Sequence, residues 1–201
     1  MKTYSIDDAE ADLRDAIDRD DLAGITRLEQ VIDDLDTHPA PVALHSAALY
    51  YAEQGIPVFP LTPGTKIPLK GSGGCLDATT DVAMVNAWWS GNPHANIGIA
   101  TGHLVDVVDI DGLKGQTSRA QNWPMFDGLQ VLGTVSTPRP GGMHLFVPRR
   151  EGITNGAGLL PGVDYRGLGG YVVAPPSRNE QGVYAWVRPL DLSTLAISGA
   201  A

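Results

Sequence analysis

The sequence predicts an α+β fold in which helices in the first half of the chain accompany a largely antiparallel sheet in the second half. Helical spacing of apolar residues is strongest over residues 5–37, 42–54 and 81–90. From residue 96 onward, short segments rich in β-branched residues alternate with glycine-containing turns. That alternation is typical of strands joined by tight connections.

The N-terminal segment is strongly acidic. Residues 1–42 hold 12 of the 23 acidic and 4 of the 14 basic residues, so they carry a net charge of −8 and leave the rest nearly neutral. Apolar spacing predicts two short amphipathic helices over residues 5–37, forming an acidic helical hairpin. The hairpin is either a solvated surface packed on the body, or a docking surface or nucleic-acid mimic that shields the functional site.

Composition excludes several classes of protein. The single cysteine, Cys75, rules out an intramolecular disulfide and a cysteine-based zinc site. No apolar run has the length of a membrane span and no secretory signal begins the sequence, so we expect a cytoplasmic protein without a membrane partner. The nearly neutral body argues against a strongly basic, non-specific nucleic-acid binder.

The elements of the body follow in order. A buried helix is expected over residues 42–54, closed by Gly55, and is followed by a strand over 56–59 and a long loop over 60–80. The next helix, near residues 81–90, carries Trp88 and Trp89, which are either core residues, the favoured interpretation, or base-stacking residues. Residues 96–102 are expected to form a hairpin with the strand that follows them.

That following strand, residues 104–112, carries the most informative pattern. Side chains alternate along a strand, so Asp109 and Asp111 are expected on one face, about 7 Å apart, and Asp106 on the other. Two neighbouring carboxylates repel each other unless a cation lies between them. Hard divalent ions prefer such oxygen ligands, which makes a metal site the first hypothesis.

The rest of the chain supplies further polar residues on predicted strands. After a weak helix at 116–127, strands are expected at 129–136, 143–147, 162–167, 171–174 and 183–187. His144 starts the second of these beside two glycines, which favours a functional role over that of a structural histidine. Asp164 and Arg166 lie on one face of the third. Three carboxylates and a histidine on one sheet suit two-metal chemistry on phosphate groups.

The loop over residues 60–80 is glycine-rich and contains Lys66 and Lys70. It fails the P-loop pattern, because Leu69 precedes Lys70 where that pattern requires glycine. The loop is either an ordinary basic surface loop or a contact for a triphosphate or a DNA backbone.

Eight segments in a fixed order resemble the bifunctional DNA primase/polymerase (prim-pol) domain of the archaeo-eukaryotic primase superfamily. Together they extend over about residues 43–188. They are residues 55–60 (GIPVFP), 76–81 (LDATTD), 88–89 (WW), 96–102 (NIGIATG), 108–112 (VDIDG), 137–144 (TPRPGGMH), 162–167 (GVDYRG) and 169–177 (GGYVVAPPS).

The resemblance implies an α/β unit packed on an RRM-like catalytic sheet, with residues 43–192 as the catalytic domain, 1–42 as an extension and 193–201 as a flexible tail or linker. It also implies a template-directed nucleotidyltransferase that uses Mg²⁺ or Mn²⁺, NTPs or dNTPs and a single-stranded DNA template, with a helicase as a further domain or partner. The implied metal ligands are Asp109, Asp111 and Asp164. The implied nucleotide contacts are His144, Arg166, Ser177 and Lys66, and the basic residues Lys70 and Arg139 are expected to contact DNA.

Two other functions remain open at this point. One is a catalytically silent replication-initiation or single-strand-binding module with the same fold, and the other is a metal-dependent nuclease. The intact carboxylates argue against the silent module. The scattered histidines at positions 38, 45, 94, 103 and 144 lack the His-x-His pair of nicking relaxases.

Overall fold

The structure is a computed structural model that describes residues 41–195 continuously and residues 11, 14–15, 19 and 21 individually. The chain divides into two units, Met1–Ala40 and Pro41–Ala201. In the first unit, Arg19 and Asp15 form an exposed ion pair of 3.0 Å. Apart from those individual positions, the acidic hairpin predicted over residues 5–37 lies outside the described residues.

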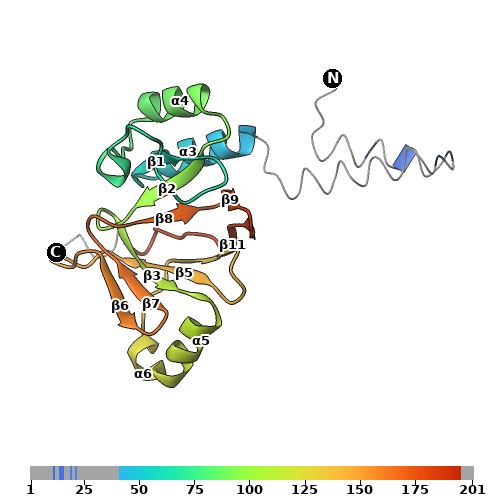
Figure 1. Cartoon of the computed structure of the whole chain (residues 1–201). Coiled ribbons are helices and arrows are strands. Elements are labelled where there is room, and N and C mark those ends of the chain that lie inside the picture. The colour runs from blue at the N-terminus through green and yellow to red at the C-terminus, as the bar shows by residue number, and fades with distance from the viewer. Residues whose placement is uncertain (1–10, 12–13, 16–18, 20, 22–40, 196–201) are drawn as a thin grey trace. The chain divides into compact units, whose positions relative to one another are not determined.

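The β-branched segments of the second unit form two larger sheets, and every strand pairing in them is antiparallel (Figure 1). A mixed α+β fold with a largely antiparallel sheet is therefore confirmed. The three-stranded sheet has the order β1 (Val58–Leu61), β2 (Asn96–Ala100), β8 (Tyr171–Ala174). The six-stranded sheet has the order β11 (Ala185–Arg188), β4 (Gly133–Ser136), β5 (Met143–Pro148), β3 (Val105–Ile110), β7 (Val163–Arg166), β6 (Gly156–Leu160).

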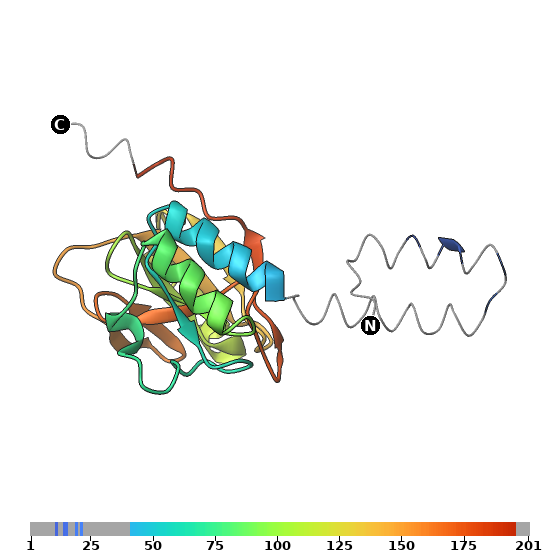
Figure 2. The ribbon, with the colours of Figure 1, turned by 90° about the horizontal axis from the view of Figure 1, so that it is seen from above.

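Two helices cover the three-stranded sheet and lie side by side (Figures 1 and 2). Helix α3 (Pro41–Glu53) buries Leu44, Ala48, Tyr51 and Ala52, which share one helical face. Helix α4 (Val82–Gly91) starts at Asp81, whose side chain accepts hydrogen bonds from the backbone N–H groups of residues 83 and 84. These elements match the predicted ranges closely because their caps and periodicity are local.

Trp89 is completely buried in the core shared by α3, α4 and the three-stranded sheet. Its indole Nε1 donates a hydrogen bond of 3.0 Å to the backbone oxygen of Ala95. Trp88 is partly buried against the same core. The prediction that these tryptophans belong to the core is confirmed.

The predicted hairpin between residues 96–102 and the Asp109 strand is wrong. Strand β2 pairs with β1 on one edge and β8 on the other, so neither edge is free for β3. The chain instead crosses from one sheet to the other at Thr101, whose N–H donates to Gly170 O and whose hydroxyl donates to Gly167 O. Strand β3 then pairs with β5 and β7.

Strand β6 is not among the predicted strands, and the other differences concern boundaries. The predicted strand at 183–187 is split into β10 (Gly182–Val183), which pairs with β9 (Arg178–Asn179), and β11. The split occurs at Tyr184, whose N–H donates to Ser177 O. The weak helix at 116–127 forms α5 (Gly112–Gln121) and α6 (Trp123–Phe126), and a short 3₁₀ helix at Gly74–Leu76 lies in the long loop. No described helix is both long and apolar enough to cross a membrane.

Candidate active site

A row of polar side chains crosses three neighbouring strands of the six-stranded sheet. Asp109 on β3 lies opposite His144 on β5 and opposite Asp164 on β7. Directly opposed residues of antiparallel strands project to the same face, so these three side chains share one face. Val105 and Val107 of β3 also lie on this face, and they belong to the same buried core as residues of β1, β2 and β8.

A cleft of about 240 Å³ opens beside this row. The six-stranded sheet contributes one wall and β8 with its preceding loop contributes another, so the cleft lies between the two sheets. Lys66 enters from the loop after β1. The cleft is lined by Lys66, Asp109, His144, Asn155, Arg166, Gly169, Gly170, Tyr171, Val172, Val173 and Tyr184.

Arg166 joins two of the carboxylates in the row. One guanidinium nitrogen, Nη2, lies 3.1 Å from Asp109 Oδ2 and 2.8 Å from Asp164 Oδ2. All three side chains are partly buried, with 22–31% of their surface exposed. Arg166 thus places a positive charge between Asp109 and Asp164, and its predicted position on the same face as Asp164 is confirmed.

Asp111 lies outside the row. Strand β3 ends at Ile110, and Asp111 occupies the N-cap position of α5 without a side-chain capping bond. Asp111 therefore lies one residue beyond the end of the strand predicted to carry it, and its carboxylate still acts electrostatically on His144. Asp111 instead forms an ion pair of 2.6 Å with Arg139, and both side chains are about half exposed.

The residue after Asp111 lies close to the Arg139 side chain. Gly112 has a φ of +62°, and a Cβ atom at this position would lie 2.9 Å from Arg139 Cδ. Glycine therefore meets both the backbone conformation and the close approach of the β4–β5 loop. A larger residue would require the Arg139 side chain to shift.

His144 is only 6% exposed. Burial lowers the pKa of its imidazole to about 4, although the nearby Asp109 carboxylate acts in the opposite direction. His144 is therefore neutral at pH 7, and its Nε2, 3.7 Å from Asp109 Oδ1, does not form an ion pair with that carboxylate. Its Nδ1 is buried without a hydrogen-bond partner among the described residues.

Tyr184 packs on His144, with ring centroids 5.8 Å apart and planes inclined by 31°. Its side chain is 1% exposed, and its hydroxyl has no hydrogen-bond partner in the described part of the chain. Burial raises the pKa of the phenol to about 12, and Asp109 adds to this shift. The uncharged Tyr184 ring therefore packs against the His144 imidazole and restricts its position.

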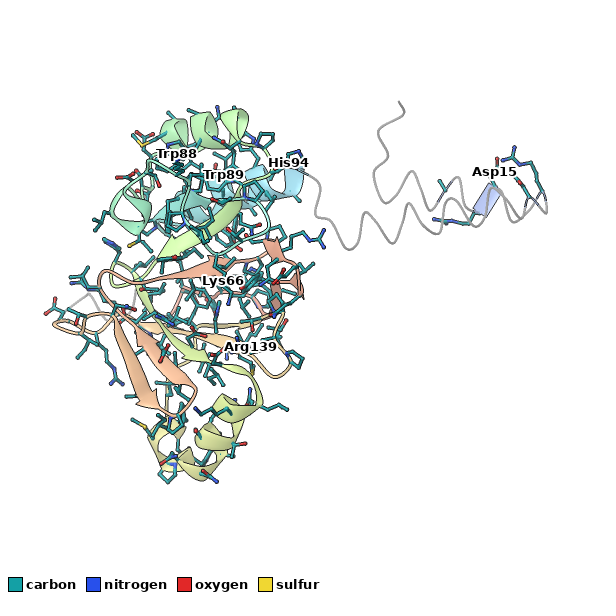
Figure 3. All side chains as sticks on the ribbon, viewed as in Figure 1. Asp15, Lys66, Trp88, Trp89, His94 and Arg139 are labelled. Atoms are coloured by element: carbon teal, nitrogen blue, oxygen red, sulfur yellow. The ribbon has the colours of Figure 1, made fainter. Side chains whose placement is uncertain are left out.

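Among the remaining predicted site residues, Lys66 lines the cleft, whereas Lys70 and Ser177 lie outside it. The backbone oxygen of Lys66 accepts a hydrogen bond of 3.0 Å from the Tyr171 hydroxyl. Figure 3 shows Lys66 at the level of the three-stranded sheet and Arg139 at that of the six-stranded sheet. Lys70 is exposed and does not line the cleft. Ser177 is completely buried, and its hydroxyl accepts the Ile97 N–H at 2.8 Å, which supports β2.

Residues 48–197 match the family model described as "Bifunctional DNA primase/polymerase, N-terminal". The match covers well over half of the 201 residues and includes every residue of the cleft. The chain belongs to the Prim-Pol family. The resemblance drawn from the eight sequence segments is thereby confirmed. A search of curated proteins gave no match.

Prim-Pol proteins generally use divalent metals, and the donor set here fits such an ion. Asp109 and Asp164 face each other across one strand pairing, and Asp111 follows two residues after Asp109. Carboxylate oxygens are the ligands that Mg²⁺ and Mn²⁺ prefer. Within residues 41–195, no three His, Cys, Asp or Glu side chains are already gathered to hold an ion. Arginines contact all three carboxylates.

Sequence reasoning missed two residues of this Prim-Pol cleft, Tyr184 and Asn155. Tyr184 stands between two short strands, and only the folding of the β9–β10 hairpin brings it to His144. Asn155 lies against Gly170, where a Cβ atom would be 2.5 Å from Asn155 Oδ1. The Gly169-Gly170 pair was the available indication, because paired glycines permit such close approach.

Proposed function

We propose that this Prim-Pol domain is a template-directed DNA primase and polymerase acting in phage, plasmid or bacterial DNA replication. The observation that supports it best is the row of His144, Asp109 and Asp164 beside a cleft that also contains Lys66 and Arg166. Carboxylates beside cationic groups suit a substrate that brings both metal ions and a triphosphate.

In the proposed reaction, a primer 3′-hydroxyl, or the hydroxyl of an initiating nucleotide, attacks the α-phosphorus of an NTP or dNTP. A new bond forms between the hydroxyl oxygen and the α-phosphorus, the bond from that phosphorus to the bridging oxygen of the β-phosphate breaks, pyrophosphate leaves, and the hydroxyl proton passes to solvent water. Asp109, Asp111 and Asp164 would hold two Mg²⁺ or Mn²⁺ ions, which when bound lower the pKa of the attacking hydroxyl and neutralise phosphate charge.

The cationic and neutral donors of the cleft would orient the nucleotide. Lys66 and Arg166 neutralise the triphosphate, and the neutral imidazole of His144 offers a hydrogen bond to it. Tyr184 keeps that imidazole in place. Ser177 enters the proposal as a support of β2, because its hydroxyl is occupied by Ile97 N–H.

The single-stranded DNA template would run over exposed cations outside the cleft. Lys70 and Arg139 are exposed and are proposed as backbone contacts, which carry no sequence information. A helicase, as a further domain or a separate protein, is the proposed replication partner. We also propose that residues 43–192 form the catalytic domain, with 1–42 as an extension and 193–201 as a tail or linker.

Incubation of the full chain with a single-stranded template of mixed sequence, labelled nucleotides and Mn²⁺ tests this proposal. Products that are longer than the input, templated and dependent on metal support it. Shortening of labelled DNA without nucleotides would instead indicate a nuclease.

The silent replication-initiation or single-strand-binding module remains a second candidate. It is favoured by the arginines on all three carboxylates, an arrangement that leaves the residues of the described unit without a gathered metal-ligand group. Nucleotide binding with and without Mn²⁺ separates the two candidates. DNA binding without metal-dependent nucleotide binding would favour the silent module.

A further inference from the structure

Arg166 occupies the oxygens that a metal ion would need. Its Nη2 contacts Oδ2 of Asp109 and Oδ2 of Asp164 at once, at 3.1 and 2.8 Å. The register places the two carboxylates directly opposite each other, so they share one cation. A guanidinium nitrogen and a divalent ion cannot lie between the same two oxygens, because both require contact distances of roughly 2–3 Å.

Removal of Arg166 from the carboxylates without a replacement cation would be unfavourable. The Asp109 and Asp164 side chains are 22% and 31% exposed, so their charges are only partly screened by water. Two partly buried carboxylates in direct opposition repel each other. The contact therefore breaks readily only when another cation takes its place.

Arg166 also borders the space that the nucleotide would fill. It lines the cleft together with Lys66 and Tyr171, whereas Asp164 does not. A guanidinium that leaves the carboxylates can therefore move into the cleft, because the Arg166 side chain already lines that partly open space. A planar guanidinium with several N–H donors binds phosphate oxygens as well as it binds carboxylates.

We propose that Arg166 is an exchangeable counter-ion: a bound metal displaces it from Asp109 and Asp164, and it then binds the triphosphate of the nucleotide in the cleft. This inference rests on the proposed function. It makes metal and nucleotide binding mutually favourable through this chain's own residue, in addition to the direct contact between metal and phosphate. By thermodynamic linkage, nucleotide binding raises metal affinity by the same factor.

Mn²⁺ binding to the full chain without nucleotide or DNA, measured by electron paramagnetic resonance of free Mn²⁺, tests the displacement step. Arg166→Met removes the competitor, so Mn²⁺ is expected to bind at least about fivefold more tightly than to the wild type. Lys66→Met is the matched control. It removes one positive charge from the same cleft, but Lys66 forms no ion pair with a described residue.

The control is expected to raise Mn²⁺ affinity less than Arg166→Met does. Equal effects of the two variants would reduce the result to general electrostatics and overturn the proposal. If Arg166→Met does not fold, Arg166→Lys replaces it in the test. A single ammonium group binds two carboxylates less well than a guanidinium does, so Mn²⁺ is expected to bind about twofold more tightly to Arg166→Lys than to the wild type. An Mn²⁺ affinity equal to that of the wild type in this variant also overturns the proposal.

Nucleotide binding supplies the second readout. At Mn²⁺ concentrations that saturate each variant, Mn²⁺ is expected to raise nucleotide affinity more in the wild type than in Arg166→Met. An equal gain in both overturns the phosphate-binding step.

These outcomes are distinguishable from failure of the proposed function. Mn²⁺-dependent primer synthesis by the wild type, with no tighter Mn²⁺ binding in Arg166→Met, overturns this inference alone. A wild-type protein that neither binds Mn²⁺ nor makes primers overturns both.

Discussion

Each face of β3 carries one aspartate, and the two aspartates differ in burial and in their hydrogen-bond partners. Asp106 is completely buried, and its Oδ2 accepts hydrogen bonds from the Arg150 N–H at 2.8 Å and the Tyr165 hydroxyl at 2.7 Å. Asp109 is partly exposed, lines the cleft and, among the described residues, accepts side-chain hydrogen bonds from Arg166 alone. One carboxylate is fixed by the fold, whereas the other faces a cation that can be exchanged.

The spaces beside the two faces differ in the same way. The Asp109 face borders a cleft with charged and polar walls. The opposite face borders a groove of about 390 Å³ with mostly apolar walls, including Val108, Phe126, Leu129 and Val147. We therefore expect a carboxylate on a buried strand to indicate function only when its surroundings leave its oxygens accessible to a ligand.

Asp109→Ala is expected to have the largest effect on activity. It removes a central metal ligand of the proposed site, so nucleotide incorporation should fall by at least about 100-fold. The free energy of unfolding should change by no more than about 1 kcal/mol, because the side chain is partly exposed and Arg166 keeps its contact with Asp164. Primer-extension rates and urea titration measure the two effects. Retained incorporation would remove Asp109 from the site.

Asp106→Ala is the matched substitution on the other face and should reverse this pattern. It leaves the Tyr165 hydroxyl and the Arg150 N–H without their acceptor, which should cost about 2–3 kcal/mol of unfolding free energy. Activity per folded molecule should stay close to that of the wild type at a temperature below the unfolding transition. A large loss of activity in the folded variant would contradict the division between the two faces.

The pH dependence of stability should report on His144. Its pKa is about 4 in the folded protein and about 6.5 in an unfolded chain, so the unfolded state binds more protons between these values. The contribution of His144 to the free energy of unfolding is therefore fully present above pH 6.5. It should fall by roughly 1–3 kcal/mol as the pH falls from 6.5 towards 4. Urea midpoints across this range should fall less steeply in His144→Gln. Parallel curves would show that another group causes the loss.

Tyr165→Phe should have the smallest effect. It measures how much of the stability lost in Asp106→Ala comes from the single hydrogen bond between the Tyr165 hydroxyl and Asp106. It removes the hydroxyl donor but leaves the Arg150 N–H contact, so a loss of about 1 kcal/mol is expected. Thermal or urea unfolding measures it. A loss as large as that of Asp106→Ala would show that the backbone contact contributes nothing.

The sequence predicted those parts of the site that depend on local patterns. Strand alternation assigned Asp106 and Asp109 to opposite faces, and the strand at 162–167 placed Asp164 and Arg166 together. The sequence predictions were wrong where contacts between distant segments determine strand pairing and strand ends. The occupied edges of β2 exclude the predicted hairpin, and the helix that begins after Asp111 ends the strand early. Tyr184 reaches His144 only through tertiary packing, which no local periodicity encodes.

The Asp109 face of β3 is proposed to bind the nucleotide. Photo-crosslinking with an azido nucleoside triphosphate and Mn²⁺, followed by peptide mapping, tests it most directly. The expected labels fall on peptides that line the cleft, such as those containing Lys66, Tyr171 or Tyr184, and unlabelled nucleotide should compete. Competable labelling of the opposite groove, at Met125, Leu129 or Leu159, would contradict the account.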